Sequence, residues 1–509
     1  SYNTMLRKIR IGISVVLFSL ITFFFLDFAG ILPNSFHRLA HLQFIPALLS
    51  FSVGILIFLI LLTLLFGRFY CSTICPMGIF QDIVARVSKS VGKKRKRYGY
   101  SPAKNILRWV IVGVTVLAFA CGFTLILGLL DPYSAYGRIA VNVFKPVYMS
   151  GNNLLESVFS RFENYTFYQT DASILSMTSF MIALVTLAII GILAWKHGRT
   201  WCNTICPVGT VLGLLSRFSL FKVRIDKNKC NGCGLCATKC KAACIDSKKH
   251  TIDYSRCVDC FDCLESCSKH ALVYSPIVSK KKQDTDTAKR RFLMTGVMTA
   301  VAAPKILAQI KETTATLGGK KAYKKENPIT PPGSVSLEHF QAHCTSCHLC
   351  VSKCPSHVLK PALMEYGLEG MMQPTVSFEK GFCNFDCTVC GDVCPNGAIK
   401  PLTVDEKHLT QMGHVIFIEE NCIVHTDGTS CGACSEHCPT QAVAMVPYKD
   451  GLTIPQVNTE ICVGCGGCEY VCPAHPFRAI YIEGNPVQKE AKPFKETETE
   501  KIEVDDFGF

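Results

Sequence analysis

Cysteine spacing is the strongest constraint on how this 509-residue chain can fold. Most of its 30 cysteines lie in runs in which successive cysteines are separated by two, two and three residues. In such a run three thiolates bind one [4Fe–4S] cluster, and the fourth binds the cluster of a partner run, so two runs fold together. Structural zinc is the alternative, but it needs four thiols per ion, usually as two pairs, and has no use for these triplets.

The first pair of runs lies between residues 230 and 267, and an Ile-Asp dipeptide precedes each run, at Ile225-Asp226 and Ile252-Asp253. This unit therefore reads as an internal duplication. The crossed rule predicts one cluster on Cys230, Cys233, Cys236 and Cys267, and a second on Cys257, Cys260, Cys263 and Cys240.

Two further eight-cysteine sets lie between residues 344 and 472. The first gap is longer in two runs, after Cys383 and after Cys422, but the later spacing is kept. The same rule predicts four clusters, on Cys344, Cys347, Cys350 and Cys394; on Cys383, Cys387, Cys390 and Cys354; on Cys422, Cys431, Cys434 and Cys472; and on Cys462, Cys465, Cys468 and Cys438. Six [4Fe–4S] clusters are therefore expected in all.

Hydropathy predicts a membrane domain, because the chain is 49% hydrophobic and its mean hydropathy is +0.26. Apolar runs long enough to span a bilayer as helices are 11–32, 43–66, 107–130 and 174–194. The first run lacks a cleavable signal-peptide pattern. The net charge of +14 comes largely from basic clusters beside apolar runs, which is typical of membrane-flanking charge and argues against nucleic acid as a partner.

The distribution of lysine and arginine predicts the orientation of these spans. The positive-inside rule places the N-terminus, the 68–106 loop and residues from 196 onward in the cytoplasm, since the 31–42 and 131–173 loops carry few basic residues. The first two-cluster unit is then cytoplasmic.

A repeated motif follows the second and the fourth apolar run. Residues 67–78 and 198–209 share the pattern Gly-Arg-x-aromatic-Cys-x-Thr-Ile-Cys-Pro-x-Gly. Both copies are expected at the cytoplasmic face, where Cys71, Cys75, Cys202 and Cys206 would converge on one metal site, most simply a seventh cluster. The alternative is that these cysteines are inert or form redox-active dithiols.

A second basic-then-apolar segment lies at 289–307. Lys289-Arg290-Arg291-Phe292-Leu293 is similar to a twin-arginine export signal, and the run to Leu307 is predicted as a fifth span. A buried or surface helix is the alternative, because the run is short and Pro304 interrupts it. A crossing here would put the last four clusters in the periplasm.

The predicted fold is thus an α-helical membrane domain of four spans, with a fifth at 292–307, joined to α+β bacterial-ferredoxin-type domains. The boundaries are 1–221 for the membrane domain, 222–276 for the two-cluster domain, 277–340 for a basic linker, 341–485 for a four-cluster domain and 486–509 for a disordered tail. Cys121 and Cys244 lie outside all predicted sites and are expected to be small buried side chains.

Residues 5–485 resemble two ferredoxin-type families joined in one chain. The four spans, the two Cys-x-x-x-Cys-Pro motifs and the two-cluster domain resemble the NapH-type membrane subunit, and the Lys-Arg-Arg-Phe-Leu segment with four clusters is similar to NapG/MauM-type polyferredoxins. This resemblance implies a quinol dehydrogenase module of the bacterial inner membrane. Membrane lipid, the quinone pool and a periplasmic reductase or cytochrome would be its partners, with quinol as a substrate.

Two other functions stay open from the sequence. Membrane ferredoxins with Cys-x-x-x-Cys-Pro motifs also look similar to a copper-reducing oxidase-assembly family, and a cytoplasmic relay to the quinone pool would need no fifth span. Six clusters favour an electron conduit over single-ion handling. No hydrolase triad, P-loop or dinucleotide fingerprint stands out, so substrate chemistry other than electron transfer is not expected, and no catalytic residue is assigned.

Overall fold

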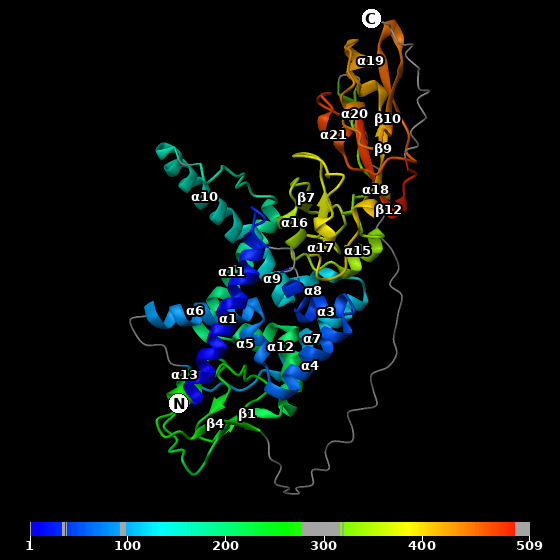
Figure 1. Cartoon of the computed structure of the whole chain (residues 1–509). Coiled ribbons are helices and arrows are strands. Elements are labelled where there is room, and N and C mark those ends of the chain that lie inside the picture. Colours follow the sequence, from blue (N-terminus) through cyan, green and yellow to red (C-terminus); the bar gives the residue numbers. More distant parts are fainter. Residues whose placement is uncertain are drawn as a thin grey trace, which may run out of the picture. The chain divides into compact units, whose positions relative to one another are not determined.

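A computed structural model describes residues 2–32, 36, 38–91, 98–163, 165–276, 316–317 and 320–493 (Figure 1). The chain divides into two compact units. The first comprises residues 1–313, 343–349 and 368–370, and the second 314–342, 350–367 and 371–509. The twin-arginine-like segment and the predicted fifth span at 292–307 lie outside the described residues.

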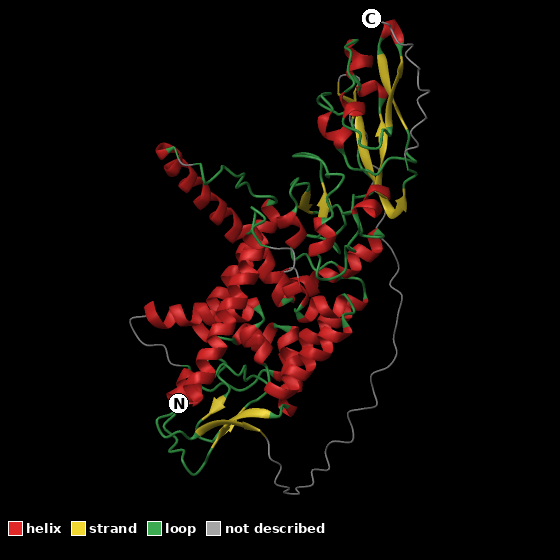
Figure 2. Cartoon of the chain, in the orientation of Figure 1, coloured by secondary structure: helices red, strands yellow, loops and turns green. Residues whose placement is uncertain are grey.

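Helices dominate the first unit (Figure 2). They are α1 (Tyr2–Leu26), α2 (Arg38–His41), α3 (Phe44–Leu49), α4 (Val53–Phe66), α5 (Phe69–Thr73), α6 (Pro76–Val91), α7 (Asn105–Ala120), α8 (Thr124–Leu130), α9 (Pro132–Ile139), α10 (Lys145–Phe159), α11 (Met177–His197) and α12 (Pro207–Leu215), with π-helical turns η2 (Ala140–Phe144) and η4 (Trp201–Ile205).

Two of the four predicted spans are continuous helices. Thr4–Leu26 and Met177–His197 are the helices in the described part of the chain that are both long and apolar enough to cross a membrane. The run 43–66 is instead divided into α3 and α4 around Phe51, whose φ is +51°, and the run 107–130 into α7 and α8 around Gly122, whose φ is +87°. The number of membrane crossings therefore stays a prediction.

The predicted 131–173 loop is largely helical in the structure. Pro132 opens α9 at its first position, and the Asp131 carboxylate caps the helix by accepting the Ser134 N–H at 2.8 Å. A π-turn, η2, continues into α10. The sequence predicted only that this segment connects two spans. Its low charge is compatible with helices as well as with a loop.

A small α+β domain follows α12, as the cysteine pattern predicts. Strand β1 (Phe221–Ile225) pairs antiparallel with β4 (Leu272–Pro276), and β2 (Ile245–Asp246) pairs with β3 (Thr251–Ile252). Helices α13 (Leu235–Lys239) and α14 (Asp262–Ser266) each contain the third cysteine of a run and end directly before the fourth. The duplication is visible here, because the N–H of the first cysteine in each run donates to the carbonyl of the lead-in aspartate at 3.1 Å.

The second unit repeats this arrangement of short helices and two-stranded ladders. Its strands are β5 (Thr316–Leu317), β6 (Lys320–Lys321), β7 (Leu359–Pro361), β8 (Pro374–Val376), β9 (Thr410–Phe417), β10 (Val443–Pro447), β11 (Thr453–Val457) and β12 (Ile480–Glu490). Its helices are α15 (Leu337–His343), α16 (Leu349–Lys353), α17 (Val389–Val393), α18 (Val404–Leu409), α19 (Ile423–Asp427), α20 (Ala433–Glu436) and α21 (Gly467–Val471).

The C-terminal boundary differs from the prediction. Strand β12 pairs with β9 as far as Glu490, so the domain does not end at residue 485. Polar composition suggested a tail from 486, but backbone pairing of Lys489 and Glu490 with Gln411 and Thr410 holds these residues in the sheet. Residues 494–509 lie outside the described part of the chain.

Candidate functional site

The ferredoxin-type domain brings together one complete predicted cysteine set. Burial, and then the nearby thiolates of Cys260, Cys240 and Cys257, raise the pKa of the Cys263 thiol. The three-plus-one arrangement that the spacing predicts is therefore present at this set. In the other set burial and then Cys230 and Cys233 raise the pKa of Cys236. The assignment of Cys267 to that set stays a prediction.

The two cysteines outside the predicted sites behave differently. Cys244 is buried, as expected, and its Sγ lies 3.5 Å from that of Cys240. Cys121 is exposed at the break between α7 and α8, so the expectation of burial was wrong for it. Val116 and Leu117 inside α7 are exposed as well, so Cys121 continues an outer face of this helix that the rest of the unit does not cover.

Three of the four predicted sets in the C-terminal domain converge within the second unit. In each, burial and then neighbouring thiolates of the same set raise the pKa of a central cysteine. These are Cys390 with Cys383, Cys354 and Cys387; Cys434 with Cys431, Cys472 and Cys422; and Cys468 with Cys465, Cys462 and Cys438.

These three sets also form a series. The N–H of Cys383 donates to the Cys465 carbonyl at 2.9 Å, so the set around Cys390 contacts the set around Cys468. The Cys434 thiolate is among the charges that raise the pKa of Cys468, so the set around Cys434 lies near the set around Cys468. The set of Cys344, Cys347, Cys350 and Cys394 has residues assigned to both units, and its convergence stays a prediction.

The four cysteines of the repeated motif lie together in the first unit. Cys71, Cys75, Cys202 and Cys206 are each at most 4% exposed. Burial, followed by the thiolates of Cys202, Cys75 and Cys71, raises the pKa of Cys206 well above its usual value. Four thiols from two distant segments therefore form one buried group, which we call the four-cysteine centre.

Two arginines cross between the motif copies. Arg68 donates to the Cys202 carbonyl at 3.3 Å, and Arg199 donates to the Cys71 carbonyl at 2.6 Å. Each guanidinium lies against the motif's last glycine in the opposite copy, where a Cβ on Gly209 or Gly78 would meet it at 2.8 or 2.7 Å. The equivalence of the two motif copies thus extends from the cysteines to the arginine and glycine of the motif.

The charge around the centre fits an anionic metal–thiolate group. Arg68 is fully buried, and within the described residues its guanidinium hydrogen-bonds to neutral oxygens and to the Cys71 thiol, at 3.8 Å, but to no carboxylate. A buried cation needs a compensating charge. Both Cys75 and Cys206 directly precede a helix that starts at proline, and the Gly209 N–H donates to the Cys206 Sγ at 3.3 Å. Helix N-termini favour negative charge.

A single metal ion fits less well. Among the described residues, no three Cys, His, Asp or Glu side chains are close enough to bind one ion, either here or in the ferredoxin-type sets. One tetrahedral zinc ion draws its sulfurs to about 2.3 Å from the metal, whereas a cubane holds its four thiolates at separate corners. A cluster-sized group therefore suits the centre better.

The motif copies are hydrogen-bonded to the ferredoxin-type domain. The Arg199 N–H donates to the Lys241 carbonyl at 3.0 Å, next to Cys240, and the Arg68 N–H donates to the Asp259 carboxylate at 3.1 Å, next to Cys260. Each copy thus touches one run of the same converged cysteine set.

A buried carboxylate reinforces this contact. Asp82 of α6 pairs with Arg10 at 3.0 Å, Arg199 at 2.7 Å and Lys241 at 3.3 Å. Burial alone would raise the pKa of Asp82, but the charges of Arg199, Lys241 and Arg10 outweigh it and hold that pKa well below its usual range. One carboxylate therefore joins α1, the second motif copy and the ferredoxin-type domain.

No local pattern indicates Asp82 or Lys241, because Asp82 pairs with Arg10 across 72 residues and with Arg199 across 117, and these groups meet only through tertiary packing. The arginines are different, since Arg68 and Arg199 occupy the same position in both motif copies. A repeated charged residue beside a predicted metal ligand is a signal that could have identified them.

Protein-family models match the two segments that carry the motif copies and also parts of the ferredoxin-type regions. A model described as "4Fe-4S binding domain" matches residues 49–97 and again 178–226, so each match contains one motif copy. Models described as "4Fe-4S dicluster domain" match residues 253–358 and 429–475.

Curated relatives are ferredoxin-type proteins that match about a third of the chain. The ferredoxin-type protein NapF of Escherichia coli (strain K12) is 29% identical over 162 residues, which are 32% of this chain and 90% of that protein. The ferredoxin-type protein NapG of the same strain is 28% identical over 230 residues, 39% of this chain and 94% of that protein. The methylamine utilization ferredoxin-type protein MauM of Methylobacillus flagellatus is 31% identical over 156 residues, 28% of this chain and 63% of that protein.

No solved structure matches the chain. The relatives and the family models support ferredoxin-type iron–sulfur domains and an electron-transfer function.

Proposed function

We propose that this chain is a membrane-bound iron–sulfur protein that passes electrons from quinol to a periplasmic redox partner. The contact between the four-cysteine centre and the converged set of Cys240, Cys257, Cys260 and Cys263 carries this proposal. A membrane domain that only anchored a ferredoxin would need no buried, charge-compensated thiols at the contact.

The chain's own residues are suited to holding seven clusters. Six would take the 24 ferredoxin-type cysteines in the predicted quartets, and the seventh would take Cys71, Cys75, Cys202 and Cys206. When bound, such clusters supply one-electron redox chemistry. At the four-cysteine centre, positive charge and N–H donors come from Arg68, Arg199 and the start of α12, and burial excludes water.

The quinol and the direction of transfer follow from the resemblance to NapH-type and NapG/MauM-type proteins. Charge bias supports a cytoplasmic ferredoxin-type domain, and a crossing at 292–307 would place the four-cluster domain in the periplasm. The two continuous apolar helices are compatible with membrane insertion.

Reconstitution of the anaerobically purified chain in liposomes tests the proposal. Addition of a short-chain quinol should reduce the clusters, followed by EPR, and iron analysis should give close to 28 iron atoms per chain if seven cubanes are present. Clusters that dithionite reduces but quinol does not, together with copper in the purified protein, would contradict quinol oxidation and favour metal handling.

The topology needs a separate measurement. A reporter that is active only in the periplasm, fused after Phe340, should be active. An active cytoplasmic reporter at the same position would contradict the crossing and leave a cytoplasmic relay to the quinone pool.

A further inference from the structure

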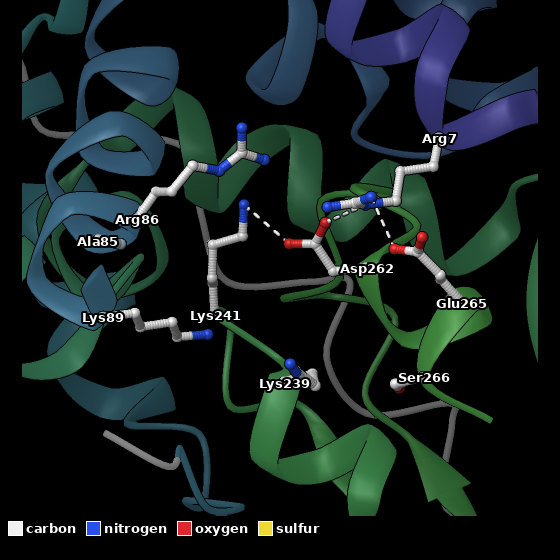
Figure 3. A pocket seen from close by; sticks show the side chains of 9 residues that line it. All are labelled: Arg7, Ala85, Arg86, Lys89, Lys239, Lys241, Asp262, Glu265 and Ser266. Atoms are coloured by element: carbon white, nitrogen blue, oxygen red, sulfur yellow. Dashed lines mark hydrogen bonds and ion pairs between the residues drawn. The ribbon is translucent and has the colours of Figure 1, made fainter. Parts of the chain in front are cut away.

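A basic cavity lies where α1, α6 and the ferredoxin-type domain meet (Figure 3). Its volume is about 290 Å³, and its charged lining consists of five cations and two carboxylates. The cations are Arg7, Arg86, Lys89, Lys239 and Lys241, and the carboxylates are Asp262 and Glu265.

Both carboxylates are already neutralised. Arg7 pairs with Asp262 at 3.0 Å and with Glu265 at 2.6 Å, and Lys241 pairs with Asp262 at 2.9 Å. These pairs are the dashed contacts of Figure 3. The two carboxylates of the cavity are thus outnumbered by its five cations, and both are ion-paired with Arg7 or Lys241.

Three cations are left without a carboxylate partner among the described residues. They are Arg86 and Lys89 of α6 and Lys239 of α13. Lys89 lies over the Tyr98 ring at 4.3 Å, and burial followed by the charge of Lys241 lowers the pKa of Lys89. The cavity thus concentrates positive charge that an anion would stabilise.

A second, apolar cavity adjoins the basic one and shares Arg86 and Lys241 with it. It also has a volume of about 290 Å³ and runs between α1 and α6. Its aliphatic and aromatic lining is Ile11, Val15, Phe18, Ile79, Ile83 and Val87.

We propose that the two cavities together bind one anionic phospholipid, with its phosphate at Arg86, Lys89 and Lys239 and an acyl chain between α1 and α6. Guanidinium and ammonium groups form charge-assisted hydrogen bonds to phosphate, and basic pockets beside membrane helices on the cytoplasmic side bind anionic headgroups. This inference rests on the membrane location in the proposed function. A free phosphate ion would use the basic cavity alone and would not explain the apolar groove that shares Arg86 with it.

Lipid retention by the full chain tests this site. The chain is solubilised in a neutral detergent, exchanged into detergent containing equal phosphatidylglycerol and phosphatidylcholine, and washed, and the retained lipid is measured by mass spectrometry. The wild type should retain phosphatidylglycerol preferentially. The combined variant Arg86→Gln, Lys89→Gln, Lys239→Gln should retain at least about tenfold less, since each cation contributes to headgroup binding.

A matched control changes three exposed lysines that line neither cavity, by Lys227→Gln, Lys248→Gln and Lys249→Gln. This control should retain phosphatidylglycerol like the wild type. Equal retention by the cavity variant, or equal loss in the control, would overturn the proposal. Iron content and dithionite-reduced EPR, measured on the same samples, separate failure of the lipid site from failure of the proposed function.

The groove and the phosphate source are tested separately. Ile83→Gln with Val87→Gln should reduce phosphatidylglycerol retention while leaving all three cations in place. If these changes have no effect, and millimolar inorganic phosphate displaces the lipid from the wild type but binds poorly to the cavity variant, the site binds free phosphate and the lipid proposal is wrong.

Discussion

The two copies of the Gly-Arg-x-aromatic-Cys motif share their cysteines, arginine and final glycine, but the helices that follow them differ. Helix α6 after the first copy carries Gln81 and Asp82, whereas the equivalent positions in α12 are Leu212 and Gly213. The shared residues surround the four-cysteine centre, and the unshared carboxylate attaches the ferredoxin-type domain. Both copies are hydrogen-bonded to the ferredoxin-type domain through their shared arginines, and the unshared carboxylate adds an ion-pair contact on one side only.

The largest effect is expected from removing one cysteine of either motif copy, and it tests whether the two copies are equivalent. Cys71→Ser and Cys202→Ser should each abolish reduction by quinol, and the double variant should be no worse than either, because residues that share one site are not additive. EPR-monitored quinol reduction in liposomes measures this. Partial, additive losses would show that each copy acts alone.

Removing the unshared carboxylate should have the next largest effect. Asp82→Asn leaves Arg10, Arg199 and Lys241 without their common partner, and breaking such a buried network costs about 3–5 kcal/mol. The thermal midpoint of the ferredoxin-type domain, followed through loss of cluster absorbance, should fall. Asp246→Asn, at a partly exposed position of the same domain outside this network, is the control and should change little.

The contribution of Asp82 should depend on pH in a defined direction. The folded-state pKa is depressed, so the stabilisation is complete above the unfolded-state value of about 3.9 and is lost as pH falls below it. The difference in midpoint between wild type and Asp82→Asn should thus stay constant from pH 8 to pH 5 and shrink below pH 4. A difference that shrinks already near pH 6 would contradict a depressed pKa.

Substitution of Arg68 and substitution of Arg199 should have different effects. The Arg199 guanidinium pairs with Asp82, whereas the Arg68 guanidinium is hydrogen-bonded to no carboxylate among the described residues. Arg68→Gln should therefore chiefly weaken cluster retention at the centre, by about 10- to 100-fold, as for other groups that support metal ligands. Arg199→Gln should also lower the thermal midpoint. Iron retention against a chelator and the midpoint, measured on both variants, separate these outcomes. Equal iron loss and an equal fall in the thermal midpoint in the two variants would contradict this difference between the arginines.

The smallest effect concerns Gln81, whose amide donates to the Cys202 Sγ at 3.0 Å. Gln81→Leu makes the first copy like the second at this position and removes a hydrogen bond to a sulfur of the four-cysteine centre. The reduction potential of the centre should become more negative, since hydrogen bonds to sulfur raise it. Redox titration measures the shift, and a potential that does not change would show that this bond has no influence.

Which cysteines lie near one another was predictable, because local spacing sets how the cysteines of a run are grouped. Cys240 indeed lies with Cys257, Cys260 and Cys263, and Cys472 with Cys422, Cys431 and Cys434. The Asp82 network was not predictable, because its members come from helices and loops that only tertiary packing brings together. Hydropathy likewise located the runs 43–66 and 107–130 but not their breaks. Gly122 marks one break, whereas nothing about Phe51 in the sequence marks the other.

The order of ligands along the C-terminal domain has a consequence for biosynthesis. Cys422, Cys431 and Cys434 are translated first, but Cys472, the predicted fourth ligand of their set, comes only after Cys438, Cys462, Cys465 and Cys468, the complete neighbouring set. The inner set can therefore be filled while the ribosome is still at work, whereas the outer one must wait until synthesis has passed residue 472. A ribosome that stalls between residues 434 and 472 holds a chain in which Cys422, Cys431 and Cys434 lack the fourth thiol of their predicted set and stay open to oxidation.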